Sequence, residues 1–286
     1  MKRLRTSLVF GALIALVVAG GQGQVAAAAT SAAPVTRLSD FNKDGFTDLI
    51  ARDAAGSLWL FPGNGSGGFK ANHKIGGGWN TYNALVTPGD VTGDHNADVI
   101  ARDAAGNLWL YPGNGVMGLS ARRQIGHGWS GYTITNAANM NSTGRPDLLA
   151  RDSAGSLWLY PLSGNAVFGA RTKVGSGWGS LVFQGPGDFS GDGRADILAH
   201  NSARELLVYR GNGAGRVAAG TVVRGGWGLI TALVTPGNWD GKAGNDFIER
   251  IPGVVPDLYL YPGNNAGGFG SGVIIGNRWR QMTYIG

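Results

Sequence analysis

Leu108–Gly115 reads LWLYPGNG, and near copies of this octapeptide recur through the chain. The copies are LWLFPGNG at Leu58, LWLYPLSG at Leu157, LLVYRGNG at Leu206 and LYLYPGNN at Leu258. A Gly-Trp or similar X-Trp pair follows each copy, with the tryptophans at Trp79, Trp129, Trp178, Trp227 and Trp279. A fixed period near 50 residues is the sequence signature of a repeat architecture. The five expected units span approximately residues 38–89, 90–138, 139–187, 188–237 and 238–286.

Within one unit, four short stretches have strand-like sequences separated by glycine turns. In the second unit they are NALVTPGD (83–90), ADVIARD (97–103), NLWLYPGN (107–114) and SARRQIGHGW (120–129). Four strands in about 50 residues is the content of one β-propeller blade. The sequence therefore predicts an all-β, five-bladed propeller. The final RQMTYIG (280–286) stops where an inner strand would lie, so we expect the two ends of the repeat region to complete one blade.

The first 29 residues are expected to be a secretory signal peptide. Lys2, Arg3 and Arg5 precede an apolar run, and an A-x-A cleavage pattern ends at Ala29. Removal of these cations lowers the formal charge from +6 to +3, which does not favour nucleic-acid binding. No later run is apolar enough to span a membrane, so we expect a secreted, soluble chain, with a monomer favoured. Cysteine is absent, which excludes disulfides and thiolate chemistry.

An acidic stretch opens the first unit, in the sequence DFNKDGFTD (40–48). Its candidate ligands are Asp40, Asn42, Asp44, Asp48 and the carbonyl of Phe46, with Gly45 at the position where an EF-hand loop needs glycine. Position 12 is Ala51 instead of a bidentate glutamate, and the flanking sequence is strand-like. The stretch is therefore expected to be a calcium loop within a β-hairpin, and not an EF-hand.

Comparing the five copies of this loop distinguishes those expected to bind a metal from those expected to be simple turns. The second unit offers Asp90, Thr92, Asp94, Asn96 and Asp98, although His95 replaces the glycine; the fourth offers Asp188, Ser190, Asp192, Asp196 and the carbonyl of Arg194. Three neighbouring carboxylates repel one another, and Ca²⁺ removes that penalty. Structural Ca²⁺ is therefore expected in units 1, 2 and 4. Asx-turns account for unit 3, and in unit 5 Lys242 is expected to take the place of the ion.

The repeat resembles known propeller families. The pattern D-x-[NTS]-x-D-G-x-x-D-[LIV]-[LI]-A-R-D, followed by LWLYPGNG and GGF, resembles the VCBS and FG-GAP repeats also found in integrin α-chain heads. The segments KIGGGW, QIGHGW and KVGSGW, with the five-fold count, resemble tachylectin, a five-bladed lectin. FG-GAP propellers often have seven blades, and five units depart from that pattern. These resemblances imply a calcium-binding propeller that recognises carbohydrate or protein.

No catalytic constellation is evident. His73, His95, His127 and His200 fall at unrelated positions in their units, and two G-x-G-x-x-G matches open no helix. We therefore expect a non-catalytic, lectin-like binding module, and consider a lyase or hydrolase less favoured. An extracellular protein-interaction propeller, binding a protease or a surface protein, is the alternative.

The tryptophans are the candidate sugar-stacking residues. Those proposed to bind ligand are Trp79, Trp129, Trp178, Trp227 and Trp279, for which packing between blades is the competing interpretation. A second set, Trp59, Trp109 and Trp158 of the LWLYP-type strands, is expected in the core. Three arginines each precede an aspartate and are expected to form ion pairs with it: Arg52, Arg102 and Arg151.

Overall fold

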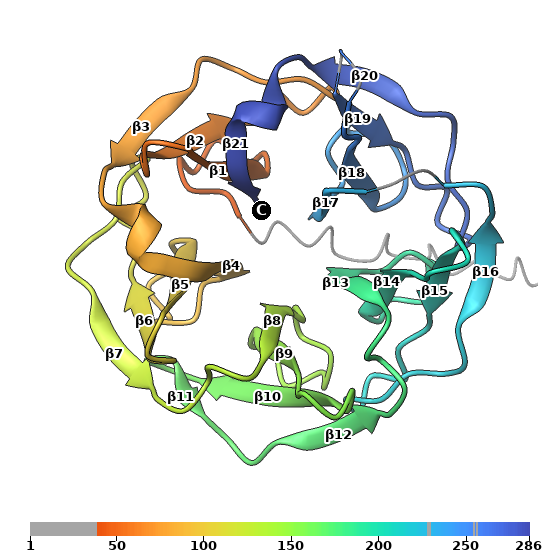
Figure 1. The fold of residues 1–286 in the computed structure, drawn as a ribbon, viewed down its shortest axis with the longest axis horizontal. Helices are drawn as coiled ribbons and strands as arrows, with labels where there is room; N and C mark the ends of the chain where they lie inside the picture. The colour runs from red at the N-terminus through yellow and green to blue at the C-terminus, as the bar shows by residue number, and fades with distance from the viewer. Residues whose placement is uncertain (1–38, 228–229, 254, 256) are drawn as a thin grey trace, which may run out of the picture. The chain divides into compact units, whose positions relative to one another are not determined.

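The computed structural model describes residues 39–227, 230–253, 255 and 257–286, and almost all of their regular structure is β-strand. The predicted signal peptide, residues 1–29, lies outside the described residues. Within those ranges, no helix is both long enough and apolar enough to cross a membrane. The strands form five antiparallel sheets, which are the blades of a propeller (Figure 1). The predicted all-β, five-bladed fold is confirmed.

The blades follow one another along the chain, and the strands of each blade run from an innermost to an outermost position. From the inside outward, blade 1 contains β21 (Met282–Ile285), β1 (Asp48–Asp53), β2 (Leu58–Pro62) and β3 (His73–Gly76). Blade 2 contains β4 (Tyr82–Gly89), β5 (Asp98–Asp103), β6 (Leu108–Tyr111) and β7 (Arg123–Gly126). Blade 3 contains β8 (Thr133–Asn136), β9 (Asp147–Arg151), β10 (Leu157–Ser163) and β12 (Thr172–Gly175), with the two-residue β11 (Val167–Phe168) added beside β10.

The last two blades have the same four-stranded plan. Blade 4 contains β13 (Val182–Gly187), β14 (Asp196–His200), β15 (Leu206–Tyr209) and β16 (Thr221–Arg224). Blade 5 contains β17 (Ala232–Gly237), β18 (Asp246–Arg250), β19 (Leu258–Tyr261) and β20 (Val273–Gly276). Two short 3-10 helices, η1 (Trp79–Thr81) and η2 (Trp279–Gln281), each lead from an outermost strand into an innermost one.

The ring closes through the C-terminal strand. β21 pairs antiparallel with β1, and the Ile50 and Gly286 backbones exchange hydrogen bonds of 2.8 and 3.0 Å. The innermost strand of blade 1 thus comes from the far end of the chain (Figure 1). Each sequence unit supplies three outer strands of one blade and the innermost strand of the next, so every unit is tied to two blades.

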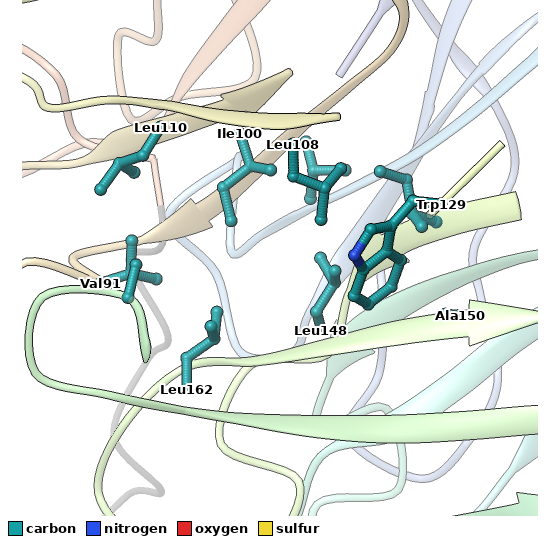
Figure 2. Close-up of a cluster of buried hydrophobic side chains, with 11 residues drawn as sticks. Val91, Ile100, Leu108, Leu110, Trp129, Leu148, Ala150 and Leu162 are labelled. Carbon is teal, nitrogen blue, oxygen red and sulfur yellow. The ribbon is translucent and has the colours of Figure 1, made fainter. Parts of the chain in front are cut away.

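The core consists of five apolar clusters, one at each junction between neighbouring blades. The third strands explain this arrangement, because their alternating residues point to opposite faces and both faces of a blade meet a neighbour. In β2, for example, Leu58 and Leu60 are fully buried while Trp59 and Phe61 are half-buried. Figure 2 shows the junction of blades 2 and 3, where the labelled side chains are Val91, Ile100, Leu108, Leu110, Trp129, Leu148, Ala150 and Leu162.

Candidate functional site

Five acidic loops lead into the second strand of each blade, and in blades 2 to 5 they connect it to the innermost strand. We number them by sequence unit: loop 1 (40–48), loop 2 (90–98), loop 3 (139–147), loop 4 (188–196) and loop 5 (238–246). Backbone N–H groups within loop 1 hold one oxygen of each of its first three predicted side-chain ligands. Gly45 donates to Asp40 at 3.0 Å, Asp44 to Asn42 at 2.9 Å, and Phe46 to Asp44 at 2.9 Å. These turns orient the loop and leave Asp40 Oδ1 without a partner, whereas Asp44 Oδ2 accepts from Asn42 Nδ2 and Lys70 Nζ.

The last aspartate of each loop is a structural residue. Asp48 is fully buried and accepts hydrogen bonds from Phe41 N at 2.9 Å and Gly63 N at 3.2 Å, which ties loop 1 to the turn after β2. Asp98 accepts equivalent bonds in loop 2 from Val91 N and Gly113 N. Burial raises the pKa of Asp48 to about 7 and that of Asp98 to about 6, against the opposing effect of these backbone donors. Asp147, Asp196 and Asp246 are equally buried in the other three loops.

Four loops retain a buried side-chain oxygen that has no hydrogen-bond partner among the described residues. These oxygens are Asp40 Oδ1 and Thr47 Oγ1 in loop 1, Asn96 Oδ1 in loop 2, Ser190 Oγ in loop 4 and Asp240 Oδ2 in loop 5. A buried polar atom without a partner is costly, and a hard cation coordinated by oxygen would satisfy it. Among the described side chains of loop 3, no such atom is found. The residues of loops 1, 2 and 4 therefore fit a calcium ion better than those of loop 3.

Loop 5 has an internal cation in place of a metal. Asp240 Oδ2 is buried without a hydrogen bond of good geometry, but it lies 3.1 Å from Lys242 Nζ. This is the arrangement predicted for the ammonium group of Lys242.

Cationic side chains also approach the loops in which we expect calcium. Lys70 Nζ lies 2.6 Å from Asp44 Oδ2, and an Arg194 guanidinium nitrogen lies 3.9 Å from Asp192 Oδ2. Burial acts to raise the pKa of Asp44, but hydrogen bonds from Lys70, Phe46 and other donors leave it lower than usual. In the described part of the chain, no three acidic or histidine side chains converge as a ready-made cation site. Calcium binding at loop 1 would thus require the Lys70 ammonium to be displaced.

The five tryptophans proposed to stack on sugars are buried. Their exposed fractions are 6, 7, 3, 6 and 6% for Trp79, Trp129, Trp178, Trp227 and Trp279, and each belongs to a different junction cluster. Sugar stacking would need at least one of these indoles to be exposed, whereas all five pack between blades, as in the competing interpretation. The backbone explains the burial, because the residue before each tryptophan has a positive φ, as at Gly78 (83°), and turns the chain into the next blade.

Arginine side chains hold these turns in place. Arg52 donates to Trp79 O at 3.0 Å and Arg102 to Trp129 O at 3.1 Å, and each reaches a second carbonyl three residues further on. Arg151 and Arg250 make the same contacts at later junctions. The interpretation of Arg52, Arg102 and Arg151 as ion-pair partners of the following aspartate is therefore wrong. The backbone carbonyls of the turns take the place of the expected carboxylates.

Those aspartates instead accept from the second set of tryptophans. Trp59, Trp109 and Trp158 each donate their Nε1–H to the preceding Asp53, Asp103 or Asp152 at 2.8 Å. Hydrogen bonds from Trp109 and Asn107 lower the pKa of Asp103 to about 2. These three indoles are half-buried, so the expectation that they form the core is also wrong.

A cationic side chain lies over each of these half-buried indoles. Arg122 lies 4.1 Å from the Trp109 ring centre, Arg171 lies 4.0 Å from that of Trp158, and Lys74 lies 5.8 Å from that of Trp59. The Arg122 and Arg171 guanidinium groups also donate to tyrosine hydroxyls. Three successive blades thus present the same group of a half-exposed indole, an aspartate and a cation, which we call the Trp-Asp-cation unit.

One buried acidic residue was not singled out by the sequence comparison. Glu249 in β18 is 1% exposed, and it occupies the repeat position of Ala51, Ala101, Ala150 and Ala199. It borders a cavity of about 180 Å³ at the junction of blades 4 and 5. The signal in the sequence is the replacement of alanine by glutamate at a position that is otherwise constant in this chain. The four histidines, in contrast, form no pair, and His200 stands where the turn-holding arginines stand in other units.

Comparison with known families identifies part of the repeat. Residues 40–101 and 139–199 match the family described as FG-GAP-like repeat. A comparison with curated proteins finds no match. Two stretches of this five-bladed propeller therefore match FG-GAP-like repeats, whereas the resemblance of its IGxGW segments to tachylectin stays a prediction.

Solved structures with a similar fold include lectins. The BP39L lectin from Burkholderia pseudomallei matches with a TM-score of 0.50 and 16% identity, over 83% of this chain and 68% of that one. A lectin from Agrocybe aegerita, described as recognising non-reducing terminal N-acetylglucosamine, matches with a TM-score of 0.49 and 18% identity, over 82% of this chain. This chain spans 64% of the Agrocybe lectin's length. At these identities the likeness shows the fold alone.

Proposed function

From the five-bladed fold and its FG-GAP-like repeats, we propose that this chain is a secreted, non-catalytic binding protein that recognises carbohydrate and is stabilised by calcium. The observation that carries the ligand class is the repetition of the Trp-Asp-cation unit on blades 1, 2 and 3. With the cation above it displaced, the half-buried indole would supply an apolar face for the C–H side of a sugar ring. The aspartate and the cation beside it supply hydrogen-bonding groups for hydroxyls.

Repetition also suits a carbohydrate ligand. Individual sugar contacts are weak, and three similar units on one rigid ring would raise the avidity for a polymer or a dense glycan surface without a strong single site. The Burkholderia pseudomallei lectin, which shares the fold, is consistent with this class of ligand. The proposal nevertheless rests on the indoles, because fold similarity alone does not assign a function.

A glycan array tests the proposal. The wild type should bind at least one class of glycan, and Trp59→Ala, Trp109→Ala and Trp158→Ala should weaken binding stepwise, with the triple variant losing it. Val116→Ser, at a residue that is 71% exposed and outside the Trp-Asp-cation units, is the matched control and should bind like the wild type. Absence of binding by the folded wild type, or equal binding by the triple variant, would refute the role of these indoles.

Blade 5 offers a specific observation for the alternative function, protein recognition. Its outermost strand, β20, exposes Val273 and Ile274 (53% and 55%), whereas the same positions of β3 in blade 1 hold His73 and Lys74. Charged residues normally protect an outer strand edge from pairing, and β20 lacks them at these positions. A cavity of about 360 Å³ lies beside it, lined in part by Leu260, Pro262 and Ile275.

An extended peptide added as a fifth strand would fit this edge. Peptides selected by display on the wild type should lose binding to an Ile274→Lys variant and retain it with Lys74→Met. If no peptide is selected, or if the selected peptides still bind the Ile274→Lys variant, peptide recognition at the β20 edge is refuted.

A further inference from the structure

Glu249 differs from the other acidic side chains of the described residues, each of which accepts at least one hydrogen bond. Twelve of the 18 acidic residues lie in the five acidic loops. Three more, Asp53, Asp103 and Asp152, accept from indole N–H groups, and Glu205 accepts from Asn201 at 2.7 Å. Asp257 accepts from the Trp279 and Arg280 backbones. Glu249 remains, in a position where the other four units have a buried alanine.

The carboxyl group of Glu249 is almost completely removed from solvent. It is 1% exposed, and its Oε2 has no hydrogen-bond partner in the described residues. Burial raises its pKa to about 7, although the Tyr261 hydroxyl and the charge of Arg224 oppose this effect. An acid buried without a full set of partners destabilises a fold, and alanine at the same site would avoid that cost. The residue is therefore better explained by a ligand than by packing.

A complementary donor lines the same cavity. Of the five junction tryptophans, Trp227 is the one whose Nε1–H is buried without a partner among the residues described. Trp227 and Glu249 both border the 180 Å³ cavity, together with Tyr261 and the exposed Arg224. The Arg224 guanidinium lies 5.3 Å from the Trp227 ring centre. The residues that border the cavity thus include one with an unpartnered acceptor, one with an unpartnered donor, two with aromatic rings and one with a cationic group.

We propose that this cavity is a binding site for a single sugar ring, recognised through two neighbouring hydroxyl groups. One hydroxyl donates to Glu249, and the oxygen of the other accepts from Trp227 Nε1–H, while the rings of Trp227 and Tyr261 contact the apolar face. The cavity of about 180 Å³ is smaller than the ~300–1,000 Å³ typical of sites for drug-sized ligands, which favours a small ligand. Arg224 at the cavity disfavours an amine, which would otherwise be the natural partner of a carboxylate between aromatic rings.

This inference rests on the proposed carbohydrate-binding function, but it concerns a different place on the ring. The Trp-Asp-cation units occur on blades 1, 2 and 3, whereas this cavity lies between blades 4 and 5. It is also unique, because no other described unit combines the glutamate with an unpartnered indole N–H. The two sites can therefore be removed independently.

Calorimetric titration with a panel of methyl glycosides tests the cavity. The wild type should bind at least one of them, and Glu249→Ala and Trp227→Phe should each weaken that binding about tenfold or more, the loss expected for one hydrogen bond to a charged or buried group. Glu205→Gln changes the only other glutamate, which lies outside the cavity, and should bind like the wild type. Because Glu249→Ala restores the residue found in the other units, it should melt at a higher temperature than the wild type, so its loss of binding could not be attributed to unfolding.

The outcomes distinguish failure of the cavity proposal from failure of the proposed carbohydrate-binding function. If glycans bind on the array but methyl glycosides bind equally to the wild type and to Glu249→Ala, the cavity proposal is refuted and the carbohydrate function stands. If neither the array nor the titration detects binding, both fail. Glu249-dependent binding of methylammonium in place of a glycoside would refute the sugar as the ligand class.

Discussion

Removal of calcium should destabilise the propeller by an amount that the acidic loops allow us to estimate. Loops 1, 2 and 4 each retain a buried oxygen without a partner among the described residues, so we expect three sites. Extracellular calcium modules bind with dissociation constants of about 10⁻⁴–10⁻³ M. At ~1 mM free Ca²⁺, mass action then adds about 0.4–1.4 kcal/mol per site to the free energy of unfolding. Three sites give roughly 1–4 kcal/mol, or about 2–16 °C in melting temperature.

Substitutions within single loops separate this effect from a nonspecific influence of salt. Asp44→Asn and Asp192→Asn should each remove one increment of the calcium-induced shift, because they keep the side-chain shape but remove a ligand charge. Thr143→Ala in loop 3 is the control, and its calcium response should equal that of the wild type. Lys70→Met should increase the response, since Lys70 Nζ lies 2.6 Å from Asp44 Oδ2 and competes with the ion.

The assay is a thermal melt by circular dichroism in Ca²⁺ and in chelator, repeated with Mg²⁺ at the same ionic strength. Magnesium prefers to keep its water ligands and should give a smaller shift. If the wild type shows no difference between calcium and chelator, the loops are turns held by their own hydrogen bonds. If all variants respond equally, calcium binds elsewhere, and the assignment to loops 1, 2 and 4 is refuted.

Three further predictions concern the packing and charge of the junctions. Trp129→Ala removes a buried junction indole and should lower the free energy of unfolding by about 3–5 kcal/mol. Trp109→Ala removes a half-buried indole and should lower it by about 1–2 kcal/mol. Equal losses of unfolding free energy in urea would contradict the difference in burial. Arg102→Met leaves two turn carbonyls without their donor and should cost about 2–4 kcal/mol. Arg145→Met, at an exposed arginine that holds no turn, should cost under about 0.5 kcal/mol. Similar unfolding midpoints for the two variants would show that the turn does not need Arg102. Because burial raises the pKa of Glu249 from 4.5 to about 7, the folded chain holds this proton more tightly than the unfolded chain, and its contribution to stability falls as pH rises through that interval. Glu249→Gln should reduce the loss of stability between pH 5 and pH 8 by about 1–3 kcal/mol, and an unchanged pH slope would refute the burial of this charge.

The repeat pattern was sufficient to predict the fold. Copies of LWLYPGNG at a spacing near 50 residues require a unit that stacks on copies of itself, and four strand-like stretches with glycine turns allow one blade per unit. The chain's final strand-like segment also indicated ring closure, which the pairing of β21 with β1 confirms. These features are local in sequence or depend on its period, so one chain without a structure is enough to reveal them.

The burial of the tryptophans could not be predicted in the same way. Both faces of a blade meet a neighbour, so the alternation in LWLYP does not tell which face is better covered. Trp109 is half-buried and packs against the cluster at the junction of blades 1 and 2, while Trp129 follows a turn that directs it into the next junction. Similarly, Arg102 is followed by Asp103 in sequence, yet it reaches carbonyls 27 and 30 residues away.

The sequence by itself determined the number of blades, the order of their strands and which acidic loops have the oxygen ligands that calcium prefers. Tertiary structure alone decided which indoles reach the surface and where Glu249 and Trp227 meet. The reason is physical: a strand's type depends on its own residues and turns, whereas exposure and unsatisfied hydrogen bonds depend on what a neighbouring blade places against it. At the junction of blades 4 and 5, Glu249 and Trp227 border the same cavity, and each has a buried polar atom without a partner among the described residues.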